Sequence, residues 1–256
     1  MAYALVTGAS KGIGKSLAEG LAARGYDLLL TARSEALLRE TGAALEARYK
    51  IKTAILAIDL SEPGAAGKVY DWAAGYDIQV LVNNAGYGLG GALDSHPLPD
   101  TLAMMRINTE LPVSLCRLLL PALKQQPQAW VLNIASSTAY QAVPGMTVYA
   151  ATKTFLLSFS RGLRQELKKT PVSVTCISPG PTDTHFVDQA MLGAKARGMA
   201  QKVHMSPQKV ADIALRGLFA GKAEIIPGFL NKVGAAAAWL LPKSLTESTA
   251  RKIYEV

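Results

Sequence analysis

Residues 7–14 read Thr-Gly-Ala-Ser-Lys-Gly-Ile-Gly, and this stretch decides the fold. The apolar run Ala2–Val6 precedes it, and the helical stretch Ile13–Arg24 follows it directly. Glycines permit a tight turn and a close approach of the backbone to a ligand, while the free N–H groups of a helix start attract phosphate. A strand, a glycine-rich turn and a helix in this order are typical of a site for a dinucleotide pyrophosphate.

Short apolar runs alternate with helical stretches along most of the chain. The expected strands are Ala2–Val6, Tyr26–Thr31, Lys52–Ile58, Val80–Val82, Ala129–Ile134, Val172–Ile177 and Ala223–Ile226, and the expected helices include Ile13–Arg24, Glu35–Tyr49, Thr101–Leu120 and Val148–Lys168. Runs that are apolar throughout indicate strands buried on both faces of a parallel sheet. We therefore predict an α/β fold, a Rossmann-type doubly wound parallel sheet of about seven strands with helices on both faces and ligand at the carboxyl edge.

The composition narrows the class of protein. The 256 residues are 50% hydrophobic and 18% charged, and no linker divides them, so we expect a single domain over residues 1–256. The formal net charge is +8, but Lys and Arg are scattered, which favours a phosphorylated small ligand over nucleic acid. No basic leader, disulfide framework or apolar run of about 20 residues is visible, so we expect a soluble, cytoplasmic protein. The three histidines lack metal-ligand spacing, and no metal site is expected.

A second group of residues has the chemistry of a proton donor. Tyr149 and Lys153 stand four residues apart in an expected helix and share one face, and Ser136 lies thirteen residues before Tyr149. The Thr-Gly-x-x-x-Gly-Ile-Gly turn, this serine and the Tyr-x-x-x-Lys pair together resemble the short-chain dehydrogenase/reductase family. The resemblance covers roughly Tyr3 to Pro227, nearly the whole chain.

The resemblance implies a role for each of these groups. Tyr149 would be the general acid in carbonyl reduction and the general base in alcohol oxidation, because the Lys153 ammonium favours its phenolate. Ser136 would hydrogen-bond and polarise the substrate oxygen. Lys153 would also hold the nicotinamide ribose, and Asn108, the helix asparagine of the family, would hold a water that links Lys153 to solvent.

A basic residue ends the second expected strand, where dinucleotide folds recognise the adenosine ribose. Arg33 stands there in place of an acidic residue, and Lys11 in the glycine-rich turn lies across the same space in this fold. Two cations form charge-assisted hydrogen bonds to a 2′-phosphate, and the family uses these positions in the same way. We therefore predict that NADP(H) is preferred over NAD(H), with solvated surface charge as the alternative.

The resemblance also implies further cofactor contacts. Asp59 and Leu60 would contact adenine, Asn83 to Gly86 would line its ribose, and Thr184 would hold the carboxamide. The expected set is Gly8, Ser10, Lys11, Gly12, Ile13, Gly14, Arg33, Asp59, Leu60, Asn83, Ala85, Gly86, Tyr149, Lys153, Pro179, Gly180, Thr182 and Thr184. Asn83 has a purely structural role as its alternative, since asparagine side chains often satisfy turn backbones.

The expected function is NADP(H)-dependent reduction of a ketone or aldehyde to an alcohol, or the reverse, on a small molecule with apolar bulk. The alternative is a non-catalytic NADP(H)-binding sensor or scaffold, which would not need Ser136, Tyr149 and Lys153. We expect residues 184–206 to cover the substrate, a homodimer or homotetramer, and neither nucleic-acid nor membrane contact. Residues 228–256 are expected to form a helical tail, whose apolar part Ala235–Trp239 could pack on a subunit, line the substrate mouth or touch a membrane surface.

Overall fold

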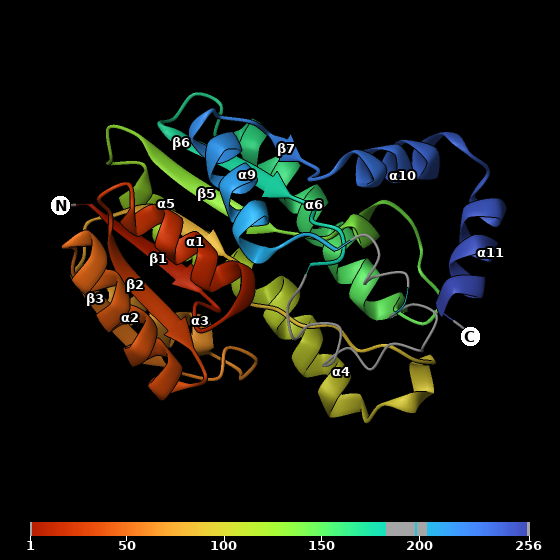
Figure 1. Ribbon diagram of the computed structural model, residues 1–256, viewed down its shortest axis with the longest axis horizontal. Helices are drawn as coiled ribbons and strands as arrows, with labels where there is room; N and C mark the ends of the chain where they lie inside the picture. The colour runs from red at the N-terminus through yellow and green to blue at the C-terminus, as the bar shows by residue number, and fades with distance from the viewer. Residues whose placement is uncertain (1, 183–197, 199–203, 255–256) are drawn as a thin grey trace.

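The computed structural model describes residues 2–182, 198 and 204–254, and one parallel sheet forms its centre (Figure 1). The seven strands follow the order β3-β2-β1-β4-β5-β6-β7. The order reverses between β1 and β4, which confirms the predicted doubly wound sheet and places the switch point at the end of these two strands. The strands are β1 Tyr3–Thr7, β2 Asp27–Ala32, β3 Thr53–Ala57, β4 Ile78–Asn83, β5 Ala129–Ile134, β6 Val172–Ile177 and β7 Glu224–Ile225.

Helices cover both faces of the sheet. One core cluster packs α1, α2 and α9 against alternate strand residues, and a second packs α3, α5 and α6 against the others. This arrangement explains why the central strands are apolar throughout, because both of their faces are buried. The helices are α1 Gly12–Ala22, α2 Glu35–Tyr49, α3 Ala65–Ala73, α4 Leu98–Met105, α5 Leu111–Leu123, α6 Thr147–Glu166, α9 Pro207–Phe219, α10 Phe229–Leu240 and α11 Lys243–Tyr254, with short turns η1 Leu93–Ser95, η2 Arg106–Glu110 and η3 Ser137–Tyr140.

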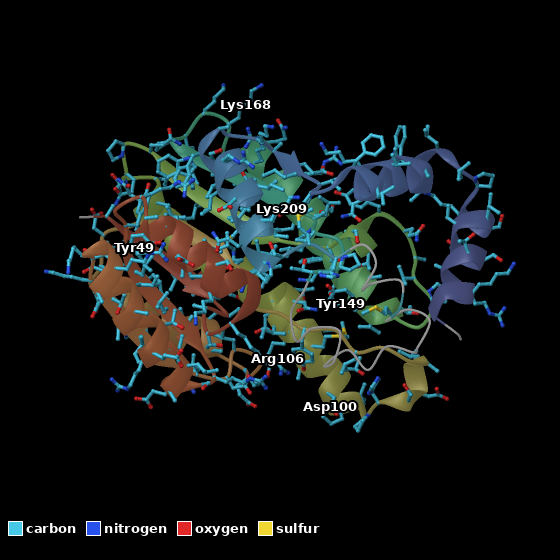
Figure 2. All side chains as sticks on the ribbon, viewed as in Figure 1. Tyr49, Asp100, Arg106, Tyr149, Lys168 and Lys209 are labelled. Carbon is cyan, nitrogen blue, oxygen red and sulfur yellow. The ribbon has the colours of Figure 1, made fainter. Side chains whose placement is uncertain are left out.

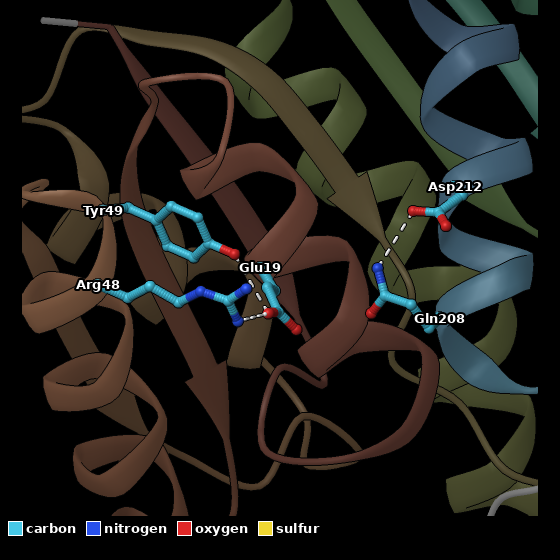
Figure 3. Close-up of polar contacts among 5 residues, drawn as sticks. All are labelled: Glu19, Arg48, Tyr49, Gln208 and Asp212. Atoms are coloured by element: carbon cyan, nitrogen blue, oxygen red, sulfur yellow. Dashed lines mark hydrogen bonds and ion pairs between the residues drawn. The ribbon is translucent and has the colours of Figure 1, made fainter.

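Helix α1 is tied to its neighbour α2, as Figure 3 shows. Arg48 Nη1 lies 2.6 Å from Glu19 Oε1, and the Tyr49 hydroxyl donates to the same oxygen at 3.2 Å. On the other side α1 packs against α9, where Gln208 bonds to Asp212 at 3.1 Å along the same helix. The Glu19 contacts and the packing against α9 hold in place the helix that follows the glycine-rich turn.

The expected helix Thr101–Leu120 is not one regular helix. It consists of α4, a π-helical turn at Arg106–Glu110, and α5. Pro112 has no N–H to donate to the carbonyl of Asn108, and the Leu111 N–H donates to the Arg106 carbonyl, five residues back, where a regular helix would pair it with Ile107. The correction matters for the site, because Asn108 lies inside this wide turn.

The two last helices extend from the body of the molecule in Figure 1. Helix α10 packs against η3, and α11 follows after Pro242. Among the described residues, no helix combines the length and the apolar character that crossing a bilayer requires.

Candidate active site

The turn after β1 leaves no room for a side chain where α1 begins. Gly8 and Gly12 have φ values of +68° and +58°, a region that favours glycine. A Cβ atom on Gly14 would overlap the carbonyl oxygen of Gly8 and lie 2.5 Å from Asn84 Nδ2. Helix α1 therefore starts in direct backbone contact with the turn, which is the cradle that a pyrophosphate requires.

Thr7 and Asn84 join the turn after β1 to the chain after β4. Thr7 Oγ1 donates to the Val82 carbonyl at 3.1 Å and accepts from the N–H groups of Asn84 and Ala85, both at 3.0 Å. Asn84 Nδ2 donates to the carbonyls of Thr7 at 2.9 Å and Gly8 at 3.2 Å. These bonds fix the switch point of the sheet, and Asn84 is absent from the set expected from the sequence.

Asn83 points the other way, into the sheet. Its side chain is 5% exposed, and Nδ2 donates to Asn133 Oδ1 at 2.8 Å. Asn133 Nδ2 in turn donates to Ser160 Oγ at 2.8 Å, which links β4, β5 and α6. These contacts favour the structural alternative for the Asn83 side chain. Leu60, 3% exposed, likewise has its side chain in the core, so the cofactor contact expected of it would come from its backbone.

The side chains expected at the adenosine end lie around Asp59, after β3. Burial alone would raise the pKa of Asp59, but two hydrogen bonds from Ser61, at 2.9 and 2.6 Å, and the nearby Arg33 charge lower it. Arg106 Nη1 donates to the Ser61 carbonyl at 2.7 Å, so η2 holds this loop from the other side. Arg33 and Lys11 are exposed and follow the carboxyl ends of β2 and β1, so an anionic ligand can reach both side chains from solvent.

Helix α6 carries the predicted catalytic pair, and Figure 2 labels its Tyr149. Lys153 is 5% exposed, and its Nζ lies 5.7 Å from the centre of the Tyr149 ring. Nζ donates to the Ile134 carbonyl at 3.0 Å, next to the end of β5. Burial lowers the pKa of Lys153 to about 8, with the nearby Cys176 acting weakly in the opposite direction. A buried ammonium of this kind loses its proton more readily than a solvated one.

Asn108 lies beside this lysine. Its Nδ2 donates to the Tyr87 carbonyl at 2.9 Å and to Thr152 Oγ1 at 3.1 Å, and its Oδ1 accepts from the Tyr87 N–H at 3.2 Å. A Cβ atom on Gly86 would lie 2.5 Å from Asn108 Oδ1 and 3.4 Å from Lys153 Nζ. The structure thus brings Asn108, Gly86 and Lys153 together from three separate segments.

Ser136 follows β5 and caps η3. Its Oγ accepts from the Thr138 N–H at 3.2 Å, and the side chain is 9% exposed. The neighbouring Ser137 N–H donates to the Pro179 carbonyl at 2.7 Å, which ties this loop to the turn after β6. Lys153 of α6 donates to the carbonyl of Ile134, two residues before Ser136. This bond holds α6 against the end of β5, from which Ser136 follows.

An apolar cluster surrounds Tyr149. Its buried members are Met104, Val143, Met146, Tyr149 and Ala150, with Tyr87, Leu89 and Val148 packed against them. These side chains come from α4, from α6, from the loop after β4 and from the loop before α6. A substrate that reaches Tyr149 therefore meets mostly carbon atoms on this side.

The turn after β6 contains the residues expected near the carboxamide. Thr182 Oγ1 donates to the Gly180 carbonyl at 3.1 Å, and the Met205 N–H donates to the Pro181 carbonyl at 3.0 Å. A Cβ atom on Gly180 would lie 2.5 Å from Asn231 Oδ1 of α10. Thr184 and most of the expected covering segment 184–206 lie outside the described residues.

Residues 2–194 match the family model described as short chain dehydrogenase. The chain belongs to the short-chain dehydrogenase family. This match confirms the family predicted from the motifs.

Among curated relatives, this short-chain dehydrogenase is 35% identical to very-long-chain 3-oxoacyl-CoA reductase-A of Danio rerio over 181 residues, 69% of this chain and 57% of that protein. It therefore spans less than two thirds of the length of that relative. The very-long-chain 3-oxoacyl-CoA reductase of Bos taurus is 34% identical over 224 residues, 79% of this chain and 72% of that one.

Solved structures support the same family. A short-chain dehydrogenase from Sphingobium yanoikuyae in complex with NADPH superposes with a TM-score of 0.83 at 27% identity, over 100% of this chain and 96% of that one. A 7beta-hydroxysteroid dehydrogenase superposes with a TM-score of 0.88 over 97% and 96%, but at 24% identity this likeness concerns the fold alone.

Proposed function

We propose that this short-chain dehydrogenase is an NADPH-preferring reductase of a carbonyl compound with apolar bulk. The observation that carries the proposal is the meeting of Lys153, Asn108 and Gly86 next to Tyr149, behind an apolar cluster. A protein that only binds a dinucleotide has no need for a buried ammonium beside a phenol at the end of this cradle.

The glycine-rich turn fits the pyrophosphate of a nicotinamide dinucleotide. The start of α1 offers unpaired backbone N–H groups to a phosphate, Gly8 and Gly12 adopt positive φ values in the turn before it, and Gly14 allows close contact between turn and helix. Asp59 would receive the adenine, and the loop Asn84–Gly86 would run along the ribose. The bound cofactor would supply the hydride that the substrate carbon accepts.

The chain itself supplies the proton. As the substrate oxygen gains negative charge, the Ser136 hydroxyl donates a hydrogen bond to it and the Tyr149 O–H bond breaks to form the alcohol O–H. Lys153 then passes a proton to the Tyr149 phenolate and recovers one from solvent along the Asn108 side. Burial, which lowers the pKa of Lys153 to about 8, makes this release of a proton possible near neutral pH.

The preference for NADPH rests on Arg33 and Lys11. Both cations are exposed, Arg33 lies near Asp59, and no carboxylate ends β2. We expect Arg33→Ser to raise the NADPH KM by roughly 10- to 100-fold, the value of a charge-assisted hydrogen bond, with little change for NADH. Arg39→Ser is the matched control, because Arg39 is an exposed arginine on α2 that pairs with Glu35.

For the substrate we propose a 3-oxoacyl thioester with a long acyl chain as the first class to test. Two curated relatives are named as very-long-chain 3-oxoacyl-CoA reductases, and the carbon-rich surroundings of Tyr149 suit an acyl chain. Ketones of similar apolar bulk, such as steroids, belong in the same panel.

The test is a panel of ketones, aldehydes and 3-oxoacyl thioesters, with NADPH and NADH side by side, followed by absorbance loss at the nicotinamide band. We expect turnover with NADPH, and a drop of roughly 100- to 10,000-fold in kcat for Tyr149→Phe at unchanged NADPH affinity. Tight NADPH binding without turnover across the panel would sink the proposal and favour a sensor.

A further inference from the structure

The tail helices α10 and α11 carry apolar side chains that stand in solvent. We define the tail patch by the seven most exposed of them, which are Phe229, Leu230, Val233, Trp239, Leu240, Leu241 and Leu245. Exposure reaches 78% for Phe229 and 82% for Trp239. Figure 1 shows both helices reaching out from the sheet, and Figure 2 shows side chains standing out from α10 on its outer side. Exposed apolar patches of this kind mark interaction surfaces.

The inner face of α10 is already in use. Asn231 touches Gly180 in the turn after β6 and donates from Nδ2 to the Pro227 carbonyl at 2.7 Å, while Ala238 is 3% exposed. At about 100° per residue, Phe229 and Leu240 share one side of the helix, opposite Asn231 and Ala238. The helix is therefore held to the body by one face and offers the other to a partner.

Basic residues outnumber acidic residues in the tail, and the acidic ones lie near its end. Between Glu224 and Glu247 the chain has no Asp or Glu, and its charged residues there are Lys232 and Lys243. Over residues 228–256 the basic residues Lys232, Lys243, Arg251 and Lys252 outnumber the acidic residues Glu247 and Glu255, and the whole chain has a net charge of +8. Exposed Trp, Phe and Leu next to lysines are the composition of helices that lie in the interface of an anionic bilayer.

A second copy of the chain is a poorer match for the same surface. A twofold contact would place the tail patch against a second tail patch, with Lys232 and Lys243 on both sides and no acidic residue between positions 225 and 246 to pair with them. An anionic lipid surface, in contrast, takes up the apolar side chains and complements the charge.

We propose that the tail patch docks on an anionic lipid surface, lying in the headgroup region without crossing the bilayer. This differs from the expectation from the sequence, which was that the chain makes no membrane contact. Because Asn231 of α10 contacts Gly180, the docked helix would hold the turn after β6 close to the membrane, where apolar substrates accumulate.

The first experiment is flotation of the full chain with phosphatidylcholine vesicles, with and without 30% phosphatidylglycerol, at about 50 and 500 mM salt. We expect binding to the anionic vesicles, weaker binding at high salt, and little binding to the neutral ones. Lys232→Gln should weaken binding to anionic vesicles about fivefold, the effect of one basic residue near such a surface.

The second experiment removes the apolar anchors. Phe229→Ser, Trp239→Ser and Leu240→Ser combined should lower vesicle affinity at least about 1,000-fold, since each buried side chain contributes roughly tenfold or more. Leu37→Ser, an exposed leucine on α2, is the matched control and should bind like the wild type. Thermal unfolding and NADPH affinity of the triple variant should match the wild type, because all three side chains are largely in solvent.

Three results would overturn the proposal. The wild type could fail to bind anionic vesicles, or the triple variant could bind them as well as the wild type does. Alternatively, sedimentation velocity could show a concentration-dependent dimer that the triple substitution disrupts while vesicle binding is absent, which would assign the patch to a second copy of the chain.

Discussion

The carboxyl edge of the sheet and the C-terminal tail differ in how their side chains are held: by internal contacts at the edge, and largely by solvent in the tail. At the edge, Thr7 and Asn108 each donate a hydrogen bond to a backbone carbonyl of another segment. A Cβ atom added at Gly14 would overlap the Gly8 carbonyl oxygen. In the tail, Trp239 is 82% exposed, and a Cβ on Gly234 would meet nothing within 4 Å. The edge is fixed by internal hydrogen bonds and tolerates few substitutions, whereas the exposed side chains of the tail are available to contact another molecule.

The largest effect should come from adding a single carbon at the edge. We expect Gly14→Ala to cost about 3 kcal/mol of unfolding free energy, the upper range for overpacking, and to weaken NADPH binding at least about tenfold. The reason is the overlap with the Gly8 carbonyl, which only a backbone shift can relieve. Denaturant unfolding and NADPH fluorescence measure the two effects. Wild-type values for both would show that the edge is softer than its contacts indicate.

The buried ammonium gives the edge a second signature, in pH. The pKa of Lys153 is lowered to about 8 from 10.5, so between these values the unfolded chain holds a proton that the folded chain has released. Stability of the wild type should therefore rise through this window relative to Lys153→Met, by up to about 3 kcal/mol, while below it the methionine variant is the more stable. Urea unfolding of both proteins from pH 7 to 10.5 provides the measurement. Parallel curves would contradict the assignment.

Two buried asparagines separate structure from catalysis within the edge. Asn108→Ala and Asn133→Ala should each cost about 1–3 kcal/mol, because both leave buried groups without partners. Only Asn108 lies beside Lys153, so only its loss should also lower kcat. Unfolding free energies and steady-state rates of the two variants test this pair. Equal rates would remove Asn108 from the proton path.

The smallest effect is expected in the tail, and with the opposite sign. Gly234→Ala, in the middle of α10 with open space around it, should raise stability by up to about 1 kcal/mol. Thermal unfolding measures the change, and vesicle flotation should be unaffected. A loss of stability would mean that the helix is more tightly surrounded than its exposure indicates.

The order of strands, turn and helices could be predicted from the sequence, because parallel strands buried on both faces are continuous apolar runs. The wide turn at residues 106–110 could not, since the apolar spacing of 101–120 fits one helix and Pro112 is its single local signal. The wide turn moves Asn108 into contact with Gly86 without changing its place in the sequence.

The neighbouring asparagines show a second limit. Asn83 and Asn84 are indistinguishable by type, but β4 ends at Asn83, and successive side chains of a strand point to opposite faces. One therefore enters the core beside Asn133 and the other grips the glycine-rich turn. The tail posed the reverse problem, because an apolar run such as 235–241 reads as core until its exposure is known.

The wide turn at Asn108 also sets the phase of the helix that follows it. One residue more than a regular coil rotates α5 by about 100° about its axis, and that rotation brings Leu115 and Leu119 onto the sheet. A one-residue deletion between 106 and 110 would turn Leu115 and Leu119 toward water and would also move Asn108 away from Gly86 and Lys153. An insertion or deletion at residues 106–110 would therefore displace both Asn108 and the buried leucines of α5, so the proton path and the hydrophobic core depend on the same chain length.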